Sequence, residues 1–245
     1  MVRQSIIPEE TALFLAQCCQ LTYEQQEQNR SFSIPWPFQL VKPFKAHSFG
    51  MEEWFGFILE SSLAIVVAFR GTKSDVDWIS DLRYSQVPYQ YVKNAGNVHS
   101  GFMGVYESCR DELIGTLKGL SPLKPIFMTG HSLGAALATL HAFDASINLD
   151  DRIIIMVNFA SPRVGDPTFV YQYKQYIPYS LRYVNFVDLI PFLPPRKIYS
   201  PIKKSYSIYR HIPNNITFYS NQQSIEANHS IQTYINFLAN KRLFA

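Results

Sequence analysis

The chain has 245 residues, of which 47% are hydrophobic and 17% charged, and its formal net charge is +3. This length is enough for one large domain with a sizeable core, and the hydrophobic content excludes a disordered chain. The charge is too small to indicate a nucleic-acid-binding protein. No run of about 18 apolar residues occurs, so we expect no membrane-spanning helix. The cysteines are expected to be reduced thiols (Cys18, Cys19 and Cys109).

The N-terminal part of the chain predicts a helix and then an irregular segment. Pro8 followed by two glutamates is typical of a first helical turn. Residues 25–43 are polar and then proline-rich, so we expect them to run over the surface. Two apolar runs, 54–60 and 63–69, predict a hairpin. We expect no signal peptide, because Arg3 would be its only basic residue. A cytoplasmic protein is therefore expected, with export without a leader as the alternative.

The rest of the chain alternates helices with short apolar strands. The pattern predicts helices at 101–119, 133–146, 167–177 and 229–240, strands at 126–129, 153–159 and 181–186, and a further strand pair near 206–219. Strands that alternate with helices indicate an α/β class with a mostly parallel central sheet flanked by helices. Because no repeat or linker interrupts the pattern, a single domain over residues 1–245 is expected.

Residues 130–134 read Gly-His-Ser-Leu-Gly, a G-x-S-x-G motif between a short apolar strand and an alanine-rich helix. In this context the serine lies on a strained strand-to-helix turn, where side chains at both glycine positions would clash. Ser132 is therefore the candidate nucleophile. The alternative is a glycine-bounded turn whose serine only caps a helix.

A serine nucleophile needs a base to take its proton and usually a carboxylate to orient that base. In hydrolases with this motif the order along the chain is serine, acid, histidine. Asp188 follows the strand at 181–186, and His229 lies just before the last helix, so both fit. The rivals are Asp166, which we expect to cap a helix, and His211, which we expect to bond to backbone. His131 is expected to point the other way on the turn.

Acyl transfer also needs hydrogen-bond donors for the developing oxyanion. The motif supplies the backbone N–H of Leu133 at the start of the helix. Thr72 follows the strand at 63–69 and offers an N–H and a hydroxyl, although a simple turn would fit this segment equally well. No H-E-x-x-H motif or cluster of Cys and His ligands occurs, so neither a metal nor a cofactor is expected.

Several segments, in this order, resemble the class 3, or fungal-type, lipase family. They are Ala-Phe-Arg-Gly-Thr (68–72), Asp-Trp-Ile-Ser-Asp-Leu (77–82), Val-His-Ser-Gly-Phe (98–102), Thr-Gly-His-Ser-Leu-Gly (129–134), Ser-Pro-Arg-Val-Gly-Asp (161–166) and Val-Asn-Phe-Val-Asp-Leu-Ile-Pro-Phe-Leu-Pro-Pro (184–195), followed by His229 and Tyr234. Residues 1–55 carry little of the resemblance. There are two small departures: Ala135 stands where the family more often has Gly, and Asn228 where it frequently has Asp.

The resemblance implies an α/β-hydrolase fold and hydrolysis of the carboxylic esters of lipids. It implies Ser132, Asp188 and His229 as a catalytic triad, and Thr72 as an oxyanion donor that Asp81 helps to orient. The expected partner is a lipid ester substrate at a membrane or droplet surface. Alternatives are a phospholipase A1 or short-chain carboxylesterase with the same triad, and a catalytically inactive lipid-binding protein on the same fold.

Residues 74–82 lie where lipases of this family carry a lid. A short helix beginning at Ser74 would place Val76 and Ile79 on one apolar face, with Trp78 to one side. Such a helix would hide an apolar pocket in water and expose it at a lipid surface. The alternative is an ordinary helix packed on the core.

Overall fold

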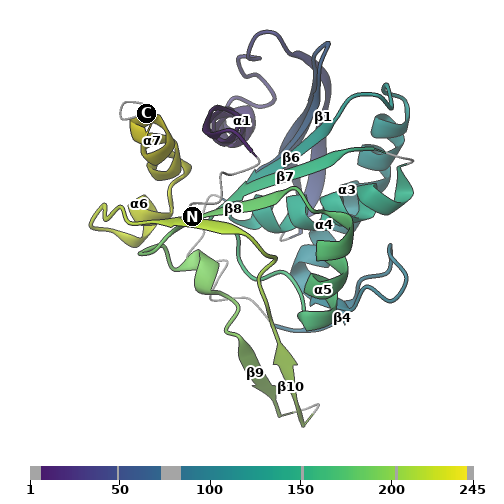
Figure 1. Ribbon diagram of the computed structural model, residues 1–245, viewed down its shortest axis with the longest axis vertical. Coiled ribbons are helices and arrows are strands. Elements are labelled where there is room, and N and C mark those ends of the chain that lie inside the picture. The colour runs from purple at the N-terminus through teal and green to yellow at the C-terminus, as the bar shows by residue number, and fades with distance from the viewer. Residues whose placement is uncertain (1–6, 49, 73–83, 150–151, 202–203, 242–245) are drawn as a thin grey trace.

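The computed structural model describes residues 7–48, 50–72, 84–149, 152–201 and 204–241 (Figure 1). Its centre is a seven-stranded sheet in the order β1-β2-β3-β6-β7-β8-β11. The strands are β1 (Gln39–Ser48), β2 (Met51–Glu60), β3 (Ile65–Phe69), β6 (Ile126–His131), β7 (Ile154–Phe159), β8 (Ser180–Asn185) and β11 (Asn215–Phe218). The last five run parallel, and β1 and β2 join them antiparallel at one edge. The predicted α/β class with a mostly parallel sheet is confirmed.

Helices cover both faces of the sheet. On one face, α1 (Glu9–Glu27) and α7 (Ile231–Lys241) lie side by side (Figure 1). On the other face pack α3 (Ser100–Lys118), α4 (Leu133–Asn148) and α5 (Pro167–Tyr176). The described residues also contain two short helices: the 3-10 helix η1 (Ile190–Phe192) follows β8, and α6 (Ile225–His229) directly precedes α7. No helix among the described residues is long and apolar enough to cross a membrane.

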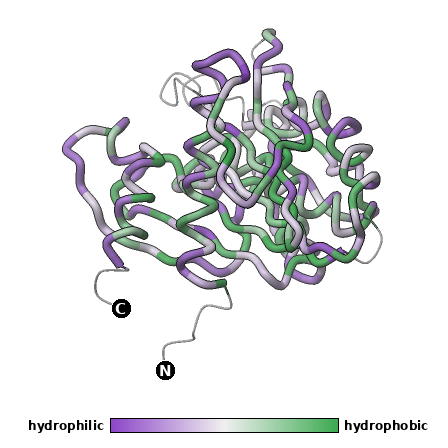
Figure 2. The backbone as a smooth tube through the Cα atoms, turned by 90° about the horizontal axis from the view of Figure 1, so that it is seen from above, coloured by the Kyte–Doolittle hydropathy of each residue, from purple (hydrophilic) through white to green (hydrophobic). Residues whose placement is uncertain are grey.

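Alternating side chains along each strand divide the core in two. In β3, Val67 and Phe69 belong to the core shared with α3 and α4, whereas Val66 and Ala68 belong to the core beneath α1 and α7. Because both faces are covered, the strand reads in the sequence as one continuous apolar run. Figure 2 shows the hydrophobic positions gathered in the middle of the molecule.

The strand β1 was not expected, because residues 25–43 read as a surface segment. It pairs antiparallel with β2, and the register shifts twice along the pair. Only Phe44, Ala46 and Ser48 of β1 are buried, so lysines and Pro43 obscure the apolar alternation. Charged residues and proline are typical of an edge strand, which explains why the sequence pattern was weak. The predicted hairpin of 54–60 and 63–69 is confirmed as β2 and β3.

Two strands lie near 206–219, but the prediction that they pair with each other is wrong. The first strand, β10 (Ser205–Ile208), pairs with β9 (Lys197–Ser200) in a separate hairpin, while β11 lies parallel to β8 in the main sheet. Strands of four residues carry too little pattern to select their partners locally. A third small sheet joins β4 (Gln86–Pro88) to β5 (Asn97–His99). The three cysteines are buried free thiols, as expected.

Candidate active site

Ser132 lies on the tight turn between β6 and α4. Its φ of 57° and ψ of −125° are a conformation that costs energy for any residue with a Cβ. A Cβ added to Gly130 would lie 2.2 Å from the carbonyl oxygen of Gly134, and one added to Gly134 would lie 2.3 Å from that of Phe69. The two glycines of the motif are therefore required by the close approach of three backbone segments. The turn leaves Leu133 as the first residue of α4.

His229 and Asp188 form a buried pair at the carboxyl end of the sheet. Nδ1 of His229 lies 2.9 Å from Oδ1 and 2.8 Å from Oδ2 of Asp188. Because a carboxylate accepts, Nδ1 carries the proton and donates it, and the lone pair of the ring is at Nε2. This is the tautomer that a general base requires.

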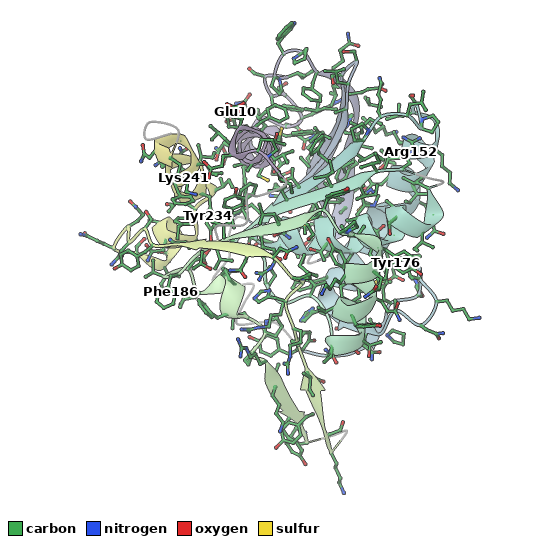
Figure 3. The ribbon with its side chains drawn as sticks, in the orientation of Figure 1. Glu10, Arg152, Tyr176, Phe186, Tyr234 and Lys241 are labelled. Atoms are coloured by element: carbon green, nitrogen blue, oxygen red, sulfur yellow. The ribbon has the colours of Figure 1, made fainter. Side chains whose placement is uncertain are left out.

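Two further donors hold the Asp188 carboxylate. The Tyr234 hydroxyl donates to Oδ2 at 2.6 Å, and the backbone N–H of Ile190 donates to Oδ1 at 2.9 Å. Figure 3 shows Tyr234 between α7 and the sheet. Burial, together with the nearby Asp188, raises the pKa of Tyr234 well above its usual value, so the phenol stays protonated and donates. The sequence singled out Tyr234 through resemblance only and did not predict this contact.

His131 contacts the histidine of the pair. We expected its side chain to point the other way on the turn, but its ring centroid lies 4.6 Å from that of His229. Its Nε2–H donates to the carbonyl oxygen of His229 at 2.7 Å, and its Nδ1 accepts from the Tyr23 hydroxyl, also at 2.7 Å. Burial, and next the neighbouring His229, lower the pKa of His131, so it stays neutral. No sequence signal pointed to Tyr23, which comes from the weakly matched N-terminal helix α1.

The segment after β3 lies against Ser132. A Cβ added to Gly71 would lie 3.1 Å from Cβ of Ser132. Thr72 follows directly and is buried. The two elements meet because β3 and β6 are adjacent parallel strands, whose carboxyl ends share one edge of the sheet. Asp81 and the expected lid residues lie outside the described residues (Val76, Trp78 and Ile79).

Residues 66–198, more than half of the chain, match the family model described as Lipase (class 3). The chain belongs to the class 3 lipase family. It is 37% identical over 143 residues to a lipase from Rhizomucor miehei, which covers 56% of this chain and 39% of that protein. It is 27% identical over 248 residues to the chloroplastic phospholipase A1-Ialpha2 of Arabidopsis thaliana, which covers 82% of this chain and 51% of that protein. The chain thus spans about half or less of the length of these curated relatives.

Solved structures of lipases share the fold. The triacylglyceride lipase of Rhizomucor miehei superposes with a TM-score of 0.66 at 26% identity, over 76% of this chain and 74% of that chain. The mono- and diacylglycerol lipase of Aspergillus oryzae superposes with a TM-score of 0.69 at 22% identity, over 89% of this chain and 82% of that chain, and shows the fold alone. The α/β-hydrolase fold expected for a class 3 lipase is confirmed.

The two rival residues have structural roles in this member of the class 3 lipase family. Asp166 is the N-cap of α5, where its Oδ1 accepts from the backbone N–H of Phe169 at 2.8 Å. His211 donates from Nε2 to the carbonyl oxygen of Pro191 at 2.6 Å. Burial lowers the pKa of His211 to about 3, so it is neutral near pH 7. Both structural interpretations are confirmed.

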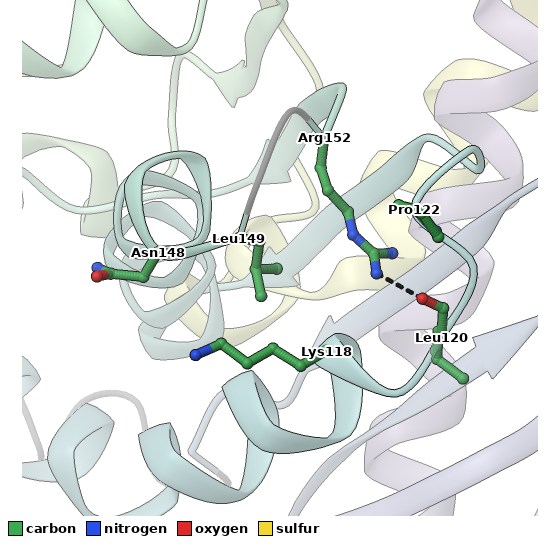
Figure 4. Close-up of a pocket in the computed structure, with 6 residues that line it drawn as sticks. All are labelled: Lys118, Leu120, Pro122, Asn148, Leu149 and Arg152. Carbon is green, nitrogen blue, oxygen red and sulfur yellow. Dashed lines mark hydrogen bonds between the residues drawn. The ribbon is translucent and has the colours of Figure 1, made fainter.

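A cavity of about 360 Å³ lies far from Ser132, at the opposite end of α4 (Figure 4). A helix of 16 residues is roughly 24 Å long, so the lining residues Asn148 and Leu149 are remote from the nucleophile. Arg152 beside the cavity donates to the carbonyl oxygen of Leu120 at 2.6 Å and to two others at the end of α3, which is a capping role. Within the described ranges, no group of three or more His, Cys, Asp or Glu side chains could hold a metal ion.

Proposed function

We propose that the protein hydrolyses carboxylic esters of lipids through an acyl-enzyme, with Ser132 as nucleophile, His229 as base and Asp188 as the acid that orients the base. The observation that carries the proposal is the pair of contacts, 2.9 and 2.8 Å, from Nδ1 of His229 to the Asp188 carboxylate. They fix the ring and its tautomer, so that Nε2 is the proton acceptor. Membership of a lipase family supports a lipid ester as the substrate.

The reaction follows from these groups. His229 takes the proton of Ser132 while Oγ attacks the ester carbonyl carbon, and the resulting oxyanion is stabilised by the N–H of Leu133 and by Thr72. The C–O bond to the alcohol breaks, and the alcohol leaves with the proton from His229. Water then attacks the acyl-enzyme in the same way and releases the fatty acid. The Asp188 carboxylate stabilises the imidazolium formed in each half of the cycle.

Acylglycerols are the substrates that we favour, and a phospholipase A1 activity is the second candidate. The alignment with the chloroplastic phospholipase A1 covers 82% of this chain, against 56% for the Rhizomucor miehei lipase, and this coverage favours the second candidate. Both reactions use the same triad. Rates against triacyl, monoacyl and phospholipid esters of several chain lengths distinguish the two, and activity only on short soluble esters would indicate a carboxylesterase.

The decisive experiment replaces the nucleophile. Ser132→Ala should lower kcat by a factor on the order of 10⁶ and abolish labelling by a fluorophosphonate probe, because no other side chain replaces Oγ. The matched control is Ser180→Ala, which removes the hydroxyl of another buried serine and should leave labelling intact. Undiminished hydrolysis by Ser132→Ala would overturn the proposal. A wild-type protein that neither labels nor cleaves any ester would favour the inactive lipid-binding alternative.

A further inference from the structure

The basic residues that give this chain its net charge are unevenly placed. Residues 189–225, directly after Asp188, contain five Lys and Arg residues and no Asp or Glu. Because the whole chain has a formal charge of +3, removal of these five cations would leave −2 for the rest. One segment next to the candidate active site therefore determines the sign of the net charge and attracts anions.

The β9–β10 hairpin lies within this segment and projects away from the main sheet (Figure 1). Four of the cations are described and exposed, and none of them takes part in an ion pair with another described residue: Arg196, Lys197, Lys204 and Arg210. Lys197 and Lys204 lie on the hairpin, and Arg196 and Arg210 flank its base, so all four are available to an anionic partner.

One face of the hairpin combines this charge with tyrosine. Tyr199 and Tyr206 are directly opposite each other in the register, so they share a face, and Lys197 lies two residues before Tyr199 on the same face. The tyrosines are 52% and 56% exposed, and the Lys197 ammonium lies 3.9 Å from the centre of the Tyr206 ring. Tyrosine with lysine is the combination that suits the boundary between the headgroups and the apolar interior of a bilayer.

Apolar side chains extend this surface toward the candidate active site. Phe186 is 62% exposed, Leu189 51% and Phe192 45%, and all three lie within four residues of Asp188. Figure 3 shows Phe186 beside η1, between α6 and the hairpin. Exposed apolar residues grouped beside a site are a feature of membrane and protein contacts. The chain thus runs from this apolar rim directly into the hairpin.

Buried Arg163 anchors the base of the hairpin. Its guanidinium donates to the carbonyl oxygens of Phe192 and Pro194, the latter at 2.6 Å. Burial, and then the nearby Arg196 and Arg210, lower the pKa of Arg163.

We propose that the β9–β10 hairpin and the adjoining apolar rim form an anchor surface that binds membranes containing anionic phospholipid. The anchor surface consists of Phe186, Leu189, Phe192, Lys197, Tyr199, Lys204 and Tyr206. Cations attract anionic headgroups, and the aromatic and apolar side chains enter the interface. The exposed apolar rim favours a membrane over a nucleic acid, because apolar side chains gain by entering the bilayer interface. Only the consequence, delivery of Ser132 to its lipid ester, rests on the proposed function.

The test measures membrane binding without hydrolysis. Vesicles made of dialkyl ether phosphatidylcholine, alone or mixed with ether phosphatidylglycerol, contain no acyl ester, so the wild-type protein can be sedimented with them unchanged. We expect binding to the mixed vesicles, little binding to phosphatidylcholine alone, and loss of binding at high salt because screening weakens attraction to the headgroups. Equal binding to both kinds of vesicle would overturn the proposal.

Paired variants locate the binding surface. Lys197→Gln with Lys204→Gln should lower the partition coefficient onto mixed vesicles by about 30-fold, since two cations leave the interface. The matched control is Lys93→Gln with Lys174→Gln, which removes the same charge from exposed residues elsewhere and should have little effect. Tyr199→Ser with Tyr206→Ser should weaken binding as well. Thermal melting of each variant shows whether its fold is intact.

Three outcomes contradict the anchor surface. Folded hairpin variants could bind as well as wild type, the control variants could lose as much binding as the hairpin variants, or the wild type could bind single-stranded RNA in a gel shift while it fails to bind vesicles. Hydrolysis of a short soluble ester by the wild type is measured separately. Failure there would overturn the proposed function and leave the binding result standing.

Discussion

The candidate nucleophile and the candidate acid–base pair are built in opposite ways. The turn at Ser132 is local: five consecutive residues, two of them glycines, pack against the backbone at the end of β3. The Asp188–His229 pair joins the loop after β8 to the end of α6, and a hydroxyl from α7 supports it. Steric exclusion maintains the turn, and hydrogen bonds between distant segments maintain the pair. Added atoms should therefore destabilise the turn, whereas the loss of a single hydrogen-bond donor should impair the pair.

After loss of the Ser132 hydroxyl itself, the largest effect on kcat is expected from replacement of Asp188. Asp188→Asn should lower kcat by about 10⁴, because an amide favours the wrong tautomer of His229 and does not stabilise its cation. The measurement is the rate on a short soluble ester, with the melting temperature as a check on the fold. The matched control is Asp166→Asn, which should affect stability and leave kcat near the wild-type value. Equal losses of kcat in the two variants would contradict the assignment of the acid.

The turn at Ser132 should be destabilised when one methyl group is added at Gly134. Gly134→Ala places a Cβ 2.3 Å from the carbonyl oxygen of Phe69, a contact that only a backbone shift relieves. We expect a loss of about 3 kcal/mol or more in the free energy of unfolding, measured by urea denaturation. Gly104→Ala is the control, because a Cβ there meets nothing within 4 Å and replaces glycine inside α3. That variant should be more stable than wild type, by about 0.4–1 kcal/mol.

The Asp188–His229 pair should be impaired by the loss of a single hydroxyl group. Tyr234→Phe removes the donor that lies 2.6 Å from Oδ2 of Asp188. A hydrogen bond to a charged group contributes about 1.5–3 kcal/mol, so kcat should fall at least about tenfold, with little change in KM. Tyr183→Phe is the matched control, because that buried hydroxyl has no hydrogen-bond partner among the described residues. Similar kcat values for the two variants would mean that Tyr234 only fills space.

Acid should destabilise the fold through His211, which contacts the segment just after Asp188. Its pKa is about 3 in the folded chain, against about 6.5 unfolded, so only the unfolded chain takes up a proton as the pH falls below 6.5. Stability contributed by this neutral histidine is therefore present above pH 6.5 and is lost on acidification, by up to about 1.4 kcal/mol per pH unit. His211→Gln should reduce the slope of unfolding free energy between pH 7 and 5. An unchanged slope would contradict a buried neutral His211.

The sequence predicted the strained strand-to-helix turn at Ser132 well because the requirements of that turn are local. Gly130 and Gly134 are visible as letters, and the turn that they allow needs no information from elsewhere in the chain. Asp188 and His229 were found through chain order after that motif, and the structure brings them into contact. Tyr23 was missed, because its contact with His131 joins residues 108 positions apart and has no local pattern.

By itself, the sequence determined the class of fold and the strained turn at Ser132, since apolar periodicity and glycine placement act over a few residues. Only the tertiary structure decided which short strands pair, as β9 with β10 and β11 with β8. It also decided that a neutral His131 supports the backbone of His229, and that Lys197 and Lys204 lie on one projecting hairpin. Such contacts depend on the packing of distant segments, whose free energy no local pattern encodes.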